Sequence, residues 1–103
     1  MGKTTPNNGS KTASKLNDEQ MQAIAHALAD PRRFAMLQTI ARGSSVSCGS
    51  VRDEHPISPA TVSHHIKELA DAGLIELARE GRCMNISLRR DVWESYISQL
   101  SLI

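Results

Sequence analysis

The stretch from residue 58 to residue 88 constrains the fold more than any other part of the chain. Ser58-Pro59 predicts a helix start, because serine caps a first turn well and proline suits the first helical position. The helix runs to Ala72, and Gly73 ends it. Two segments with the alternation of strands follow at once. These predicted strands cover residues 74–79 and 83–88, on either side of the tight turn Glu80-Gly81-Arg82.

Four more helices are expected around this stretch. Asn17 and Gln20 have the spacing of a capping box at the start of the first helix, which runs to residue 29. Asp30-Pro31 ends that helix and starts the second. The short third helix covers Gly49–Glu54, and the last starts near Arg90. The second helix is expected to turn these residues inward: Phe34, Leu37, Ile40 and Ala41.

Length and composition fit one small domain. The chain has 103 residues, of which 40% are hydrophobic, with only one Phe, one Trp and one Tyr, so its core must be aliphatic. Residues 1–15 are almost free of apolar side chains and are predicted to be a disordered tail, which leaves residues 16–103 as the folded unit. The fold class is therefore mainly α with a small β-hairpin. No apolar run suits a membrane span or a secretion signal, so a cytoplasmic protein with free thiols is expected.

The helix over residues 59–72 has two contrasting faces. Val62, Ile66 and Leu69 fall together at 100° per residue and must face the core. The opposite face is short, polar and able to donate hydrogen bonds, as a helix in the DNA major groove must be. The net charge is only +1, so any DNA-binding surface must gather its basic residues on one face. The residues predicted to contact DNA are Ser58, Ala60, Thr61, Ser63, His64, Lys67, Arg79 and Arg82.

The same residues resemble a known family. The run Ser63 to Ile75 is similar to the signature Ser-x-His-Leu-x-x-Leu-x-x-Ala-Gly-Leu-Ile of the ArsR/SmtB repressors, with His65 at its histidine. The segment 27–33 and the turn Glu80-Gly81-Arg82 resemble two further landmarks. The resemblance spans residues 16–100 and implies a winged helix-turn-helix fold. It also implies a homodimer that binds an inverted-repeat operator in double-stranded DNA and represses a nearby operon.

The dimer is expected to form through the first and last helices, because their apolar stripes are too rich for one small core. These residues are predicted at its interface: Met21, Ile24, Leu28, Trp93, Tyr96, Ile97 and Leu100.

The chain departs from the metal-sensing members of the family. They hold Cys-x-Cys at the third helix, or Asp and His along the last, whereas this chain has the single thiol of Cys48 and no histidine in its last helix. Zn²⁺ or As(III) prefers three or four ligands, and Cys48 with His55 gives two, so no metal or other cofactor is expected. Cys48 and Cys83 remain either ordinary cysteines or a redox switch, and a thiol-redox or metal-responsive sensor of the same family is the alternative function. Near a helix start, the pKa of the Cys48 thiol is expected to be low.

Two other classes of function stay open beside DNA binding. Cys48, His55 and Asp53 have the residue types of a nucleophile and its base, but nothing in the sequence brings them together, so no enzyme is predicted. A winged helix that binds protein is the second alternative. It is disfavoured because Ser63, His64 and Lys67 keep a polar, donor-bearing face.

Overall fold

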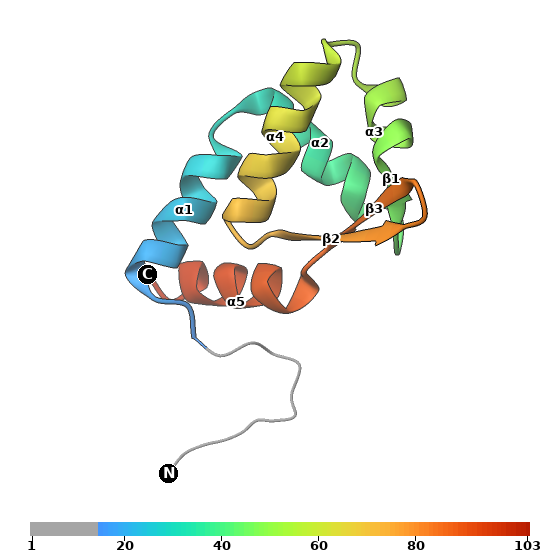
Figure 1. Ribbon diagram of the computed structural model, residues 1–103. Coiled ribbons are helices and arrows are strands. Elements are labelled where there is room, and N and C mark those ends of the chain that lie inside the picture. The colour runs from blue at the N-terminus through green and yellow to red at the C-terminus, as the bar shows by residue number, and fades with distance from the viewer. Residues whose placement is uncertain (1–14) are drawn as a thin grey trace.

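A computed structural model describes residues 15–103 (Figure 1), so almost all of the predicted tail at 1–15 lies outside the described residues. The prediction of five helices and a hairpin is confirmed. The elements in chain order are α1 (Asp18–Leu28), α2 (Pro31–Ala41), β1 (Val46–Ser47), α3 (Cys48–Glu54), α4 (Pro59–Asp71), β2 (Ile75–Glu80), β3 (Cys83–Leu88) and α5 (Arg90–Ser101). Within the described residues, no helix is long and apolar enough to cross a membrane.

The first helix starts as its sequence predicts. The Asn17 side chain accepts the Gln20 amide at 2.7 Å, and the Gln20 side chain accepts the Asn17 amide at 2.8 Å. Leu16, just before the cap, is buried. The Leu16 amide donates to Gln99 Oε1 at 2.7 Å, and Gln99 Nε2 donates to the Leu16 carbonyl at 3.0 Å. These two hydrogen bonds fasten the start of α1 to α5.

The second helix turns a different face inward from the one predicted. Asp30 caps it, and its side chain accepts the amides of Arg32 and Arg33. Leu37 and Ile40 are buried as expected, but Phe34 is 39% exposed and Met36 is fully buried. The prediction for Phe34 was therefore wrong. The buried face of the helix consists of residues 33, 36, 37 and 40, and Phe34 lies at the edge of this face.

The hairpin belongs to a three-stranded antiparallel sheet in the order β1-β3-β2. Glu80 pairs with Cys83, so the turn is the two residues Gly81-Arg82, with Gly81 at a φ of 62°. The third strand, β1, was not predicted: Val46 pairs with Ile86, the fully buried centre of β3. Figure 1 shows the hairpin projecting from one side of the helices, with α4 beside it.

The core corrects part of the predicted dimer interface. Ile24 is fully inaccessible within one chain and Tyr96 is 6% exposed, so both pack in the core and offer almost no surface to a partner. Met21, Leu28 and Trp93 are partly buried against the same core. Ile97 and Leu100 are exposed on α5. A single core of aliphatic residues thus joins all five helices to the sheet.

Candidate nucleic-acid interface

Helix α4 is held at its start by the predicted cap. The Ser58 side chain accepts the Thr61 amide at 3.2 Å, and the two hydroxyl oxygens lie 2.8 Å apart. Pro59 takes the first helical position. The hydroxyls of Ser58 and Thr61, both predicted to contact DNA, are therefore bonded to each other and fix the helix start.

The two faces of α4 are divided as the sequence predicts. Val62, Ile66 and Leu69 are buried, which fixes the rotation of the helix about its axis. The opposite face presents Ala60, Ser63, His64 and Lys67 to solvent. Small and polar side chains on this face leave the backbone open to close approach by a partner.

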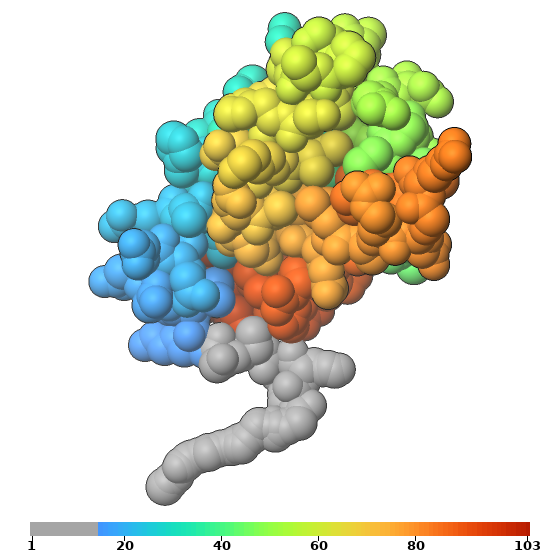
Figure 2. Space-filling view, viewed as in Figure 1, coloured from blue at the N-terminus to red at the C-terminus, as the bar shows by residue number. Residues whose placement is uncertain are grey.

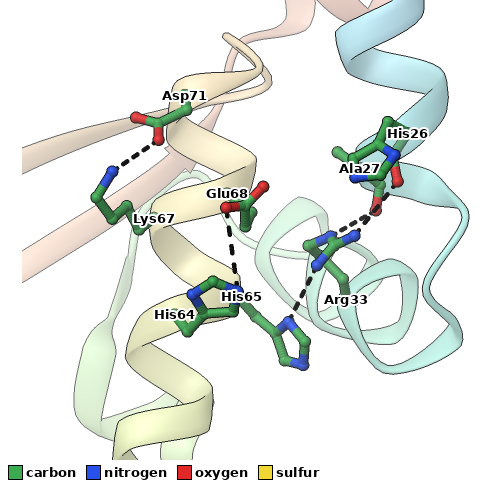
Figure 3. A network of polar contacts seen from close by, with 8 residues as sticks. All are labelled: His26, Ala27, Arg33, His64, His65, Lys67, Glu68 and Asp71. Atoms are coloured by element: carbon green, nitrogen blue, oxygen red, sulfur yellow. Dashed lines mark hydrogen bonds and ion pairs between the residues drawn. The ribbon is translucent and has the colours of Figure 1, made fainter.

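Two acidic side chains lie beside the basic residues of this face (Figure 3). Lys67 Nζ donates to Asp71 Oδ2 at 2.8 Å, and His64 Nε2 lies 4.0 Å from Glu68 Oε2. The bond to Asp71 raises the pKa of Lys67. Both pairs are well exposed, and such pairs contribute little to stability. Lys67 can therefore exchange Asp71 for another anion at small cost.

The hairpin adds cations that no carboxylate neutralises. Arg79 on β2 and Arg82 in the turn are exposed, and neither forms an ion pair with another residue in 15–103. Glu80, between them, accepts instead from the Asn85 side chain at 2.7 Å. Figure 2 shows the surfaces of α4 and the hairpin adjoining on one face of the molecule. The hairpin that carries the two arginines thus adjoins the helix that carries the polar face.

Sequence reasoning did not single out Arg52. It lies on α3, which is joined to α4 by residues 55–58, and its side chain is exposed without an ion pair to any described residue. The signal was present in the sequence, as a basic residue on the helix that precedes the polar one.

His65 lies on the other side of α4 from His64 and is buried. Its Nδ1 lies 3.4 Å from an arginine nitrogen, Arg33 Nη1, as Figure 3 shows. His65 is thus a packed histidine in polar contact with Arg33, and the sequence analysis did not foresee the burial of Arg33.

The two cysteines differ in their exposure to solvent. Cys48 is the first residue of α3, one residue before the predicted start of this helix, and it is half-buried. Burial raises the pKa of its thiol, and the opposing effect of Arg52 is smaller, so the expected low pKa is wrong. Cys83 is exposed at the start of β3.

Of the residues weighed for an enzyme or metal site, His55 has a partner elsewhere. His55 Nε2 lies 3.0 Å from the hydroxyl of Thr39. Across residues 15–103 there is no cluster of three or more Cys, His, Asp or Glu side chains able to hold a metal ion. That the chain uses no metal stays a prediction.

The fold and this face define a winged helix-turn-helix DNA-binding domain, in which α3 and α4 form the helix-turn-helix and β2-β3 the wing. Residues 28–78 match the family of helix-turn-helix domains. The chain is 36% identical over 85 residues to YceK, an uncharacterized HTH-type transcriptional regulator of Bacillus subtilis, a match that covers 81% of this chain and 85% of the relative.

Two further comparisons agree with this class. The chain is 41% identical over 63 residues to a probable mercury resistance operon repressor of Streptomyces lividans, covering 60% of this chain and about half (49%) of that protein. The crystal structure of an ArsR family transcriptional regulator superposes with a TM-score of 0.74 at 25% identity, covering 85% of this chain and 90% of that one. The chain belongs to the ArsR-type winged helix-turn-helix transcriptional regulators, and it binds DNA.

Proposed function

We propose that two copies of the chain bind an inverted-repeat operator in double-stranded DNA and repress transcription from it. The observation that carries the proposal is the exposed, donor-bearing face of α4 beside a wing whose two arginines have no carboxylate partner within the described residues. Such a helix can enter the major groove while the wing follows the adjacent backbone. Since the ligand is operator DNA, the proposed compartment of action is the cytoplasm.

The contacts divide into two kinds. Ser63 and His64 lie near the start of α4, where a recognition helix reaches base edges, and we assign them to base reading. Lys67, Arg79 and Arg82 are assigned to phosphates, which attract cations without reading sequence. Ala60 leaves room for the backbone to approach, and the Ser58–Thr61 cap holds the first turn in place.

Two features support the dimer: the apolar side chains that α1 and α5 leave exposed, and the inverted repeat of the proposed operator. Ile97 and Leu100 are exposed apolar side chains on α5, and Met21, Leu28 and Trp93 lie partly exposed in α1 and α5. Covering them with a second copy removes apolar surface from water. A two-fold axis between the copies then sets half-sites about one helical turn, roughly 10 base pairs, apart. Repression is in keeping with the similar protein of Streptomyces lividans, which is named as a repressor.

The test is binding to a fluorescent duplex from the gene's own promoter, measured over a range of salt concentrations. Arg79→Ala and Arg82→Ala are each expected to weaken binding to every sequence and to reduce the salt slope by about one for each phosphate that the variant no longer neutralises. His64→Ala is expected to cost about 1–3 kcal/mol and to relax the base preference at one position.

Arg90→Ala is the control, because Arg90 is also an exposed arginine without an ion pair in the described chain but lies on α5, where it donates to the Ala41 carbonyl. It is expected to leave the salt slope unchanged. If the wing variants kept the wild-type slope and His64→Ala kept both affinity and preference, the assignment of this face to DNA would be wrong.

A further inference from the structure

A buried arginine joins α2 to the end of α1. The Arg33 side chain is 7% exposed. Its Nε donates to the Ala27 carbonyl at 2.7 Å and its Nη2 to the His26 carbonyl at 3.3 Å (Figure 3). In a continuing helix the Ala27 carbonyl would accept the amide of residue 31, but that residue is Pro31, which has none. Arg33 therefore supplies the donor that the sequence of α1 and α2 lacks.

The remaining terminal nitrogen of Arg33 points to the DNA-facing helix. Arg33 Nη1 lies 3.4 Å from His65 Nδ1, and His65, on α4, is 6% exposed. An arginine can only donate, so this contact is a hydrogen bond only while His65 Nδ1 keeps its lone pair. The ring must then be neutral, with its proton on Nε2. One side chain thus fastens α4 to the junction of α1 and α2.

Burial and the neighbouring charges together favour the neutral form of His65. Burial is the largest influence and lowers the pKa of His65. Asp30, from the α1–α2 junction, acts in the opposite direction, but its carboxylate already accepts two backbone amides. Arg33 and Arg32 of α2 lower the pKa further.

The remaining neighbours of His65 lie on α4 itself and on α1. His64, next along α4, also lowers the pKa of His65, and Glu68 of α4 pairs with His64. His26 of α1 meets the network through its backbone carbonyl. A proton on His65 would place two cations in the buried contact with Arg33, and no carboxylate within the described residues forms an ion pair with either side chain.

We propose that Arg33 and His65 are positioning residues for DNA binding: their contact holds α4 at the angle that DNA requires, and protonation of His65 breaks it and releases the operator. This inference rests on the proposed function, since α4 is the helix assigned to the major groove. Neither residue is placed in contact with DNA.

The direction of the pH effect follows from the geometry. A group whose pKa is lowered by folding stabilises the fold fully above its ordinary value, here 6.5, and loses that contribution as the pH falls through the lowered value. DNA affinity is therefore expected to fall in mild acid. His64, which is exposed and lies on the face assigned to DNA, is therefore varied beside His65 as the control.

The experiment compares two matched variants, His65→Asn and His64→Asn, on the same promoter duplex at constant ionic strength, from neutral to mildly acid pH. The wild type is expected to lose up to about tenfold in affinity per pH unit for each protonated His65. Asparagine keeps an acceptor for Arg33 but cannot titrate. His65→Asn is therefore expected to bind at neutral pH and to lose the acid-induced fall, whereas His64→Asn retains it.

A second measurement needs no DNA. Imidazole NMR of the free dimer is expected to show His65 with an unprotonated Nδ1 and a pKa below 6.5, which rises in Arg33→Gln. A wild-type His65 that titrates normally with a protonated Nδ1 would overturn the inference, as would a His65→Asn variant with an unchanged acid profile. A wild type that binds no DNA at neutral pH, with the NMR result as expected, would instead overturn the proposed function.

Discussion

At the scale of single residues, burial decides which of the two thiols can react. Cys48 begins α3, where exposed helix amides would lower a thiol pKa, yet it is half-buried and its pKa is raised. The desolvation of the thiolate outweighs the opposing effect of Arg52. The position of Cys48 at the helix start therefore predicts a lowered thiol pKa, whereas the burial of its side chain raises it.

We expect a thiol-alkylating reagent to label Cys83 well before Cys48 at neutral pH. Cys83 is exposed on β3, whereas Cys48 is both shielded and less ionised. Peptide mass spectrometry over a time course measures the two rates. In Cys83→Ser the remaining thiol is expected to label slowly in the folded protein and quickly in urea. Equal rates in the folded wild type would contradict this ordering.

At the scale of elements, the structure follows the local signals closely and departs from them where an element depends on a distant partner. Caps and turns such as Asn17, Ser58 and Gly81 act within a few residues, so the sequence predicts α1, α4 and the hairpin. The strand β1 has only two residues and exists because β3 pairs with it, which no local pattern reveals.

The candidate site divides in the same way. The exposed face of α4 was predictable because helical periodicity separates Ser63 and His64 from Val62 and Ile66. The burial of Arg33 was not predictable. It depends on the Ala27 carbonyl, which Pro31 leaves without a helical donor, and on His65, which lies 32 residues further along the chain. A basic side chain is assigned to solvent unless that partner is known.

Two glycines in different elements are expected to respond oppositely to alanine. Gly81 has a φ of 62°, so Gly81→Ala should destabilise the fold by about 1–2 kcal/mol. Gly49 lies in α3, and a methyl group there would meet only the Ser47 hydroxyl oxygen, at 3.8 Å. Gly49→Ala should therefore stabilise by about 0.5–1 kcal/mol. Urea unfolding measures both, and a Gly81→Ala variant as stable as Gly49→Ala would refute the strained turn.

At the scale of the whole molecule, the polar face and the apolar surface of α5 lie on different elements. The residues proposed to contact DNA belong to α4 and the hairpin, whereas Ile97 and Leu100 belong to α5, which is fastened to the start of α1 by Gln99. A second copy can therefore cover α5 and leave both polar faces free. The two-fold symmetry of the proposed operator is that of the proposed dimer.

This arrangement predicts that Leu100→Glu yields a folded monomer with weakened operator binding. Leu100 is 40% exposed in one chain, so a carboxylate there disturbs the core little, but it would be desolvated against a second copy. Leu77→Glu is the matched control, because Leu77 is also 40% exposed but lies on β2 of the wing. Sedimentation equilibrium at micromolar concentration should give a dimer for the wild type and Leu77→Glu and a monomer for Leu100→Glu, with circular dichroism to confirm folding. A dimeric Leu100→Glu, or a wild type that sediments as a monomer, would remove α5 from the interface.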